Sequence, residues 1–224
     1  MREGRIIFAN IRRMLFYLLS TNAGEVLTAL GALVVGMPVP LVAVQILWVN
    51  LVTDSLMVIP IGLEPGEKTI MHHDPKKVDA PVVSNFIVQR ICLVALTMAG
   101  LTLALYAIYS DLYGVEYGRT IAFSCLVVMQ WANAFNARSD YQSLLTRLKT
   151  FNTPFYVGLS LAIFFQLLAL FGPLQPLLHV APVAIGDLAF TSAIAFVTPI
   201  LLVEIHKFIG RRIRTDLNLI PRTK

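Results

Sequence analysis

Residues 14–63 read MLFYLLSTNAGEVLTALGALVVGMPVPLVAVQILWVNLVTDSLMVIPIGL, and this stretch decides the fold of the 224-residue chain. It holds two apolar runs, residues 14–35 and 41–63, each long enough to cross about 30 Å of hydrocarbon, which takes a helix of about 20 residues. Only the uncharged turn Gly36–Pro40 separates the runs, so the two helices must be antiparallel neighbours. Strand-like alternation is absent, and lipid does not tolerate open sheet edges. The stretch therefore predicts a helical hairpin within a membrane.

Four further runs continue the pattern, at residues 86–109, 120–137, 154–171 and 188–205, and the run at 120–137 is the most polar. Hydrophobic residues make up 57% of the sequence and charged residues 14%, whereas about 25% of a typical soluble domain is charged. The mean hydropathy is +0.73. This composition excludes a soluble domain, a disordered tail and a disulfide-stapled module. We expect an all-α, multi-pass integral membrane protein, a bundle of six transmembrane helices in the lipid bilayer.

The basic residues predict the orientation of this bundle. When the chain is threaded as six spans, all of the 18 Lys and Arg residues except Arg119 fall on one side. The positive-inside rule makes that side cytoplasmic, and both termini with it. The net charge of +5 is thereby read as an orientation signal, and no nucleic-acid partner is expected. We expect a cytoplasmic stalk start at residues 1–13, a membrane domain at 14–208 and a basic cytoplasmic tail at 209–224.

Two acidic residues lie deep in the apolar runs, Glu25 in the first and Asp54 in the second. A charge at the centre of a bilayer is costly and rarely occurs without a partner or a function. Both residues lie about 17–21 Å from the turn, at about 1.5 Å per residue. We expect the carboxyl groups to meet at similar depth and, without a cation, to hold at least one proton, because close carboxylates in a low dielectric resist double ionisation. Pro60 and Gly62 are expected to allow local unwinding that frees backbone carbonyls.

Each acid has oxygen-bearing neighbours at helical spacing. Asn22 precedes Glu25 by three residues, and Asn50 and Thr53 precede Asp54 by four and by one. Two carboxylates, two amides and a hydroxyl form an all-oxygen set, without His or Cys. Such a set suits hard cations such as Ca²⁺, and by ligand type alone also Na⁺, Mn²⁺ or Mg²⁺. The pattern predicts a cation site, and the structural alternative is a pair of protonated carboxyls hydrogen-bonded across a helix interface.

The run at residues 120–137 adds three amides at spacings of three, Gln130, Asn133 and Asn136. Gln130 lies nearest the middle of the run and is expected to give the cation site one more oxygen. For Asn133 and Asn136, a hydrogen-bonded contact between helices is the favoured interpretation. The same interpretation holds for Gln166 in the run at 154–171.

Two motifs, YLLSTNAGE at residues 17–25 and QILWVNLVTD at residues 45–54, resemble the fifth and sixth membrane helices of P-type cation-transporting ATPases. The match is best to the calcium-pump branch, for which LWVNLVTD is a specific signature. QWANAFN at residues 130–136 resembles the eighth helix of that family. Gly4, Arg5 and Asn10 resemble the stalk before the fifth helix, and Ile70, Met71 and Pro75 resemble the loop after the sixth.

The resemblance implies roles for the candidate residues. Asn22 and Glu25 correspond to cation ligands of the fifth helix, and the set from Asn50 to Asp54 corresponds to ligands of the sixth. Asp54 corresponds to the residue that two-ion pumps share between their sites. Gln130 stands where the reticulum-type pump has a glutamate; this departure removes a charge from one site and resembles the one-ion plasma-membrane branch. The expected ligands of the transported cation, Ca²⁺, are Asn22, Glu25, Asn50, Thr53, Asp54 and Gln130.

The family's phosphorylation motif Asp-Lys-Thr-Gly, its Pro-Glu-Gly-Leu break and its nucleotide-binding region do not occur in this sequence. We therefore expect the C-terminal membrane part of an ATP-driven pump, a fragment or split subunit that hydrolyses no ATP alone. Its partner is then an N-terminal half with four helices and the cytoplasmic domains that bind ATP and Mg²⁺. The alternatives are a non-catalytic membrane module associated with another pump, and a secondary cation/proton exchanger. In a prokaryote the expected location is the plasma (inner) membrane.

Overall fold

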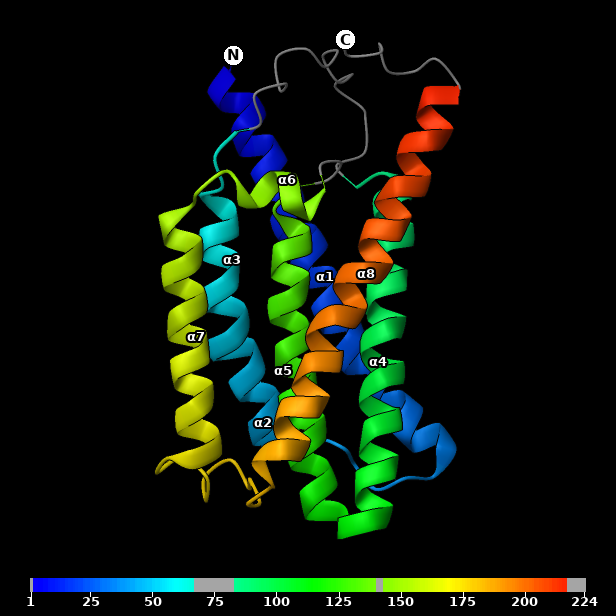
Figure 1. Cartoon of the computed structure of the whole chain (residues 1–224), viewed down its shortest axis with the longest axis vertical. Helices are drawn as coiled ribbons and strands as arrows, with labels where there is room; N and C mark the ends of the chain where they lie inside the picture. The colour runs from blue at the N-terminus through cyan, green and yellow to red at the C-terminus, as the bar shows by residue number, and fades with distance from the viewer. Residues whose placement is uncertain (1, 67–82, 140–142, 217–224) are drawn as a thin grey trace.

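The computed structural model describes residues 2–66, 83–139 and 143–216, and within these ranges all regular structure is helical. The elements are α1 (Arg2–Val35), α2 (Ala43–Trp48), the π-helix η1 (Val49–Asp54), α3 (Ser55–Gly62), α4 (Asn85–Tyr113), α5 (Val115–Ala137), α6 (Leu144–Leu148), α7 (Thr153–Phe171) and α8 (Ile185–Asp216). Figure 1 shows the long helices side by side along one axis. The start of α1 and the end of α8 lie at the same end of the bundle. The predicted all-α membrane fold is confirmed.

Five segments of the described chain are long and apolar enough to cross a membrane: α1, the α2–α3 segment, α4, α7 and α8. Helix α5, which covers the predicted span at 120–137, is not among them. It runs through the middle of the bundle (Figure 1), and most of its side chains are buried by the surrounding helices. A helix that is shielded from lipid can carry amides and hydroxyls at little cost. Six crossings and cytoplasmic termini remain predictions.

Helix α1 is longer than the predicted first span, because the charged segment before Met14 continues the same helix from Arg2. A short helix that the sequence did not predict, α6, lies between α5 and α7, and Ser143 caps it by accepting from the backbone N–H of Thr146. The motif residues Ile70, Met71 and Pro75 lie outside the described residues.

Sharp turns place the helices that carry the candidate residues. Gly36, at φ 76°, follows the end of α1, and Gly114, at φ 93°, forms the break between α4 and α5. Both are left-handed conformations that suit glycine. Large apolar side chains such as Val26, Leu96 and Phe164 are exposed on the outer faces of the bundle, as expected of a surface in contact with lipid.

Candidate cation site

The second predicted span is a broken helix, in which η1 separates α2 from α3. A π-helix hydrogen-bonds at i→i+5, is rare, and occurs frequently at functional sites. Asn50, Thr53 and Asp54 all lie within η1. Irregular backbone is therefore present beside the candidate ligands, where a helix of ordinary winding was expected.

The unwinding predicted at Pro60 and Gly62 is wrong in its position. Helix α3 continues through Pro60 to Gly62, and the departure from α-helix comes earlier, at residues 49–54. Proline removes one backbone donor and frees the carbonyl four residues before it, which is that of Leu56. That carbonyl lies against α7, because a Cβ added to Gly158 would be 2.4 Å from the Leu56 oxygen. Close helix packing at a glycine thus covers the freed carbonyl.

Glu25 is held by amides from two other helices. Asn50 Nδ2 donates to its Oε2 at 2.9 Å, and Gln130 Nε2 donates to its Oε1 at 2.8 Å. The Glu25 side chain is nearly buried, at 7% exposure. The structure therefore brings together three of the predicted ligands, from α1, η1 and α5.

Asp54 is held by two hydroxyls of α1. Tyr17 donates to Oδ1 at 3.0 Å and Thr21 donates to Oδ2 at 3.4 Å. These partners lie two turns and one turn before Glu25 on α1, so the two acids are staggered by about one turn and not directly opposed. The residue opposite Glu25 is Asn50, one turn before Asp54. The two acids, which were expected at similar depth, lie at two adjacent levels about one helical turn apart, joined through η1.

Tyr17 and Thr21 were not among the predicted site residues, although both are fully buried. Their spacing contained the signal, because residues 17, 21 and 25 follow one another at intervals of four and lie on one face of α1. A buried carboxylate without a bound cation requires hydrogen-bond donors, and the hydroxyls of Tyr17 and Thr21 supply them to Asp54.

Only one of the two polar side-chain atoms of Gln130 forms a hydrogen bond within the described residues. Its nitrogen binds Glu25, whereas its buried Oε1 has no hydrogen-bond partner in the described part of the chain. An unpartnered buried acceptor costs free energy unless a ligand satisfies it. This oxygen fits the predicted role of a neutral cation ligand.

Two predicted ligands lie apart from the acids in this structure. Asn22 is exposed, and its Nδ2 donates to the Leu18 carbonyl of its own helix at 2.7 Å. Three residues of α-helix turn through about 300°, so the side chains of Asn22 and Glu25 leave α1 in different directions. Thr53 is buried in η1, and none of its hydrogen bonds in the described chain joins it to either acid.

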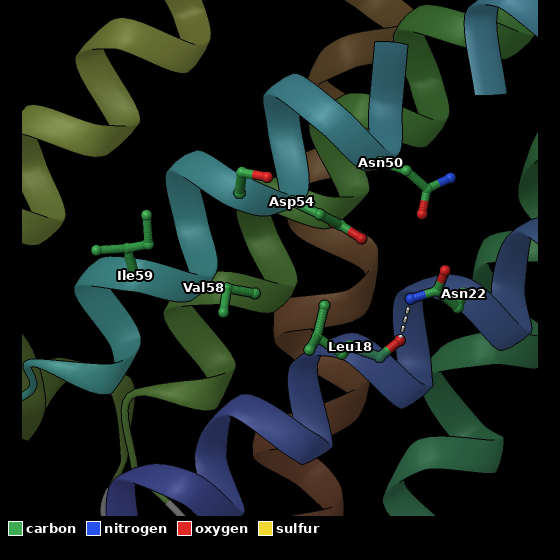
Figure 2. Close-up of a pocket in the computed structure, with 7 residues that line it drawn as sticks. Leu18, Asn22, Asn50, Asp54, Val58 and Ile59 are labelled. Atoms are coloured by element: carbon green, nitrogen blue, oxygen red, sulfur yellow. Dashed lines mark hydrogen bonds between the residues drawn. The ribbon is translucent and has the colours of Figure 1, made fainter. Parts of the chain in front are cut away.

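A groove of about 240 Å³ lies between α1 and the η1–α3 segment. Figure 2 shows Asn50 and Asp54 on one wall and Leu18 and Asn22 on the other. Asn22, Ser55 and Ile59 are exposed, so the groove opens on the outer surface of the bundle. Asn22 and Asp54 thus line the same space without touching.

The donors around this groove are oxygens and amides. No cluster of three or more His, Cys, Asp or Glu side chains occurs in the described ranges. Two carboxylates, supplemented by amide oxygens, suit a hard cation that also takes water or backbone carbonyls. The remaining amides join helices as predicted: Asn133 donates to Ser20 at 2.7 Å, Asn136 to the Pro199 carbonyl at 3.1 Å, and Gln166 accepts from Trp48 at 3.3 Å.

The comparison with known families decides the assignment of the chain. Residues 38–209 match the family model described as "Cation transporting ATPase, C-terminus". The chain belongs to this family. The match covers most of the chain, from the turn before α2 into α8, and confirms the family resemblance drawn from the sequence motifs.

Members of the cation-transporting ATPase family with curated names support the same assignment. A calcium-transporting ATPase of Bacillus subtilis (strain 168) is 33% identical over 190 residues, which cover 83% of this chain and 21% of the relative. An endoplasmic reticulum-type calcium-transporting ATPase of Arabidopsis thaliana is 29% identical over 240 residues, covering 93% of this chain and 24% of the relative. The chain thus spans between a fifth and a quarter of the length of these relatives.

Proposed function

We propose that the chain is the C-terminal transmembrane part of an ATP-driven Ca²⁺ pump and supplies most of its intramembrane ligands. The observation that carries the proposal is the pairing of two buried acids, Glu25 on α1 and Asp54 in a π-helix, each held by neutral hydrogen-bond donors. The similarity to calcium-transporting ATPases supports Ca²⁺ as the cation. A divalent cation offsets the cost of two carboxylates in a bilayer.

In this proposal Asp54 is the central ligand and Glu25 the second charge. Asn50 and Gln130 release their bonds to Glu25 and turn their oxygens to the cation, whereas Thr53 and Asn22 add oxygens when the η1 backbone and the groove rearrange. The groove supports this role for Asn22, since Asn22 and Asp54 both line it. Side-chain amides suit such an exchange, because each carries both a donor and an acceptor.

The partner in this proposal is an N-terminal half with four membrane helices and the cytoplasmic domains that bind ATP and Mg²⁺. The length of the relatives supports it, as does the open groove beside Asp54, which leaves room for further ligands. Residues 1–13 are then the cytoplasmic stalk, 14–208 the membrane domain, and 209–224 a basic cytoplasmic tail. The purified chain alone hydrolyses no ATP, because phosphoryl transfer needs a phosphate cradle and Mg²⁺ ligands.

The test joins this chain to the N-terminal half of the Bacillus subtilis relative and measures phosphorylation by ATP as Ca²⁺ is varied. Asp54→Asn, which keeps the size of the side chain, is expected to abolish Ca²⁺-dependent phosphorylation. The matched control is Asp187→Asn at the far end of the bundle, which is expected to leave the Ca²⁺ dependence in place. Near-normal Ca²⁺ dependence in Asp54→Asn would contradict the proposal and favour a structural hydrogen-bonded pair. Activation of the parent by Na⁺, Mn²⁺ or Mg²⁺ in place of Ca²⁺ would contradict the choice of cation.

A further inference from the structure

A third buried acid, Glu64, lies outside the cation site, two residues beyond the end of α3. The residue is 1% exposed and its carboxylate is surrounded by donors from three parts of the chain. Arg138, just after α5, lies 3.0–3.2 Å from its oxygens, and Arg147 of α6 lies 3.1 Å from Oε1. Asn152, the N-cap of α7, donates to Oε2 at 2.6 Å.

The same short segment is also held from α1. Asn10 Nδ2 donates to the carbonyls of Gly62 and Glu64, both at 2.9 Å. Arg13 in turn donates to the Asn10 Oδ1 at 2.9 Å. The last carbonyls of a helix have no partners within it, so Asn10 terminates α3 and fixes its end to the first third of α1.

The opposite end of the broken helix has a comparable anchor. Gln45, in the first turn of α2, is fully buried; its Oε1 accepts from the Val42 N–H at 3.1 Å and its Nε2 donates to the Leu178 carbonyl at 3.0 Å. The α2–η1–α3 segment is therefore fixed at both ends, and the π-helix with Asn50 and Asp54 lies between the two anchors. Asp54 and Glu64 are ten residues apart, about 15 Å along a helix.

We propose that Glu64 is a positioning residue for the cation site: its carboxylate fixes the end of α3 against α1, α5 and α7, and thereby sets the position of Asp54 relative to Glu25. The inference rests on the proposed function, because its consequence is a change in cation affinity. Glu64 carries the negative charge of this cluster, whereas its partners Arg138 and Arg147 are cations and Asn152 is neutral. Loss of its charge removes the carboxylate that binds the buried guanidinium groups of Arg138 and Arg147.

The test uses the full 224-residue chain in lipid nanodiscs with Tb³⁺ as a luminescent substitute for Ca²⁺, excited through Trp48 and Trp131, which adjoin η1 and Gln130. Glu64→Gln is expected to weaken Tb³⁺ binding at least tenfold and to raise amide hydrogen exchange in residues 6–13 and 55–63. Asn10→Ala removes the bonds to the Gly62 and Glu64 carbonyls, and one acceptor of Arg13, but leaves the Glu64 carboxylate and its arginine partners in place. It is expected to act in the same direction if Glu64→Gln does not fold.

The matched control is Asn136→Ala, which breaks the buried bond from α5 to the Pro199 carbonyl of α8. It is expected to lower the melting temperature while Tb³⁺ affinity stays within twofold of the parent. An affinity within twofold of the parent in both Glu64→Gln and Asn10→Ala would overturn the positioning role, whatever the exchange shows. Failure of the parent chain to bind Tb³⁺ would overturn the proposed cation site; the exchange data then decide on Glu64, and unchanged exchange would overturn its role as an anchor.

Discussion

The hydroxyl of Tyr17 donates to Asp54 Oδ1 at 3.0 Å, and this bond joins the middle of α1 to the last residue of the π-helix. Tyr17 has no exposed surface, and Asp54 has 3%. The bond orients the carboxylate that we propose as the central cation ligand. It also makes the position of Asp54 depend on a residue that precedes Glu25 by two helical turns.

Tyr17→Phe is the first prediction. Removal of the hydroxyl leaves Asp54 with Thr21 as its remaining side-chain donor, and loss of a group that orients a metal ligand typically weakens binding by about 10–100-fold. We expect a Tb³⁺ affinity for the nanodisc-bound chain that is lower by about tenfold or more. Tyr113→Phe, an exposed tyrosine at the end of α4, is the control and should leave affinity unchanged. Equal affinities for the two variants would show that Tyr17 does not orient Asp54.

Gln130→Ala tests the contribution of one neutral candidate ligand independently of the two acids. The variant removes the donor to Glu25 Oε1 and one candidate oxygen, but it leaves both carboxylates in place. In the pump joined to its N-terminal half, we expect full phosphorylation at saturating Ca²⁺, with the half-saturating concentration raised about tenfold, equivalent to roughly 1.4 kcal/mol. Loss of phosphorylation at every Ca²⁺ concentration would instead give Gln130 the same importance as Asp54.

The apolar runs predicted the long helices because a membrane requires about 20 apolar residues in sequence, and that requirement is visible in residue types. Asn50, Asp54 and Glu25 were assigned to one candidate site for a similar reason, since a tight turn makes their helices neighbours. The π-helix was not predicted, because the change from i→i+4 to i→i+5 bonding at residues 49–54 leaves no pattern in side-chain type. The π-helix can be recognised only from the backbone conformation.

The Glu64 cluster was missed for a different reason. Arg138 and Arg147 were interpreted only as orientation signals, in the way that loop cations ordinarily are. In the structure both are buried against Glu64, from positions 74 and 83 residues further along the chain. Such a contact depends on how α3, α5 and α7 pack together, and spacing within one helix does not contain that information.

Cysteine labelling tests the predicted orientation. In a background with Cys92 and Cys125 replaced by alanine, cysteines are introduced at Asp111, near the end of α4, and at Gly186, in the first turn of α8, both of which are exposed. These two helix ends lie away from the start of α1 (Figure 1), so both cysteines should react with an impermeant maleimide added from outside. A cysteine at Glu3 should react only after the membrane is opened. The prediction for Lys76, which lies outside the described residues, is the same as for Glu3. Labelling of Glu3 or Lys76 from outside would reverse the orientation.

The contact between α3 and α7 gives a prediction for stability. A Cβ on Gly158 would lie 2.4 Å from the Leu56 carbonyl oxygen and 2.9 Å from Pro60 Cγ. The first of these is a backbone atom that cannot rotate away, so Gly158→Ala must push the two helices apart. Overpacking of this kind typically costs about 1–3 kcal/mol, and we expect a lower melting temperature in detergent.

The control is Gly100→Ala in α4, where a new Cβ has no neighbour within 4 Å. Alanine is favoured over glycine inside a helix by about 1 kcal/mol, so this variant should melt at the same temperature as the parent or above it. The two substitutions are chemically identical and differ only in what the added methyl group meets. If Gly158→Ala were as stable as Gly100→Ala, α7 would not pack closely on the freed Leu56 carbonyl, and the contact between α3 and α7 would have to be looser than the structure shows.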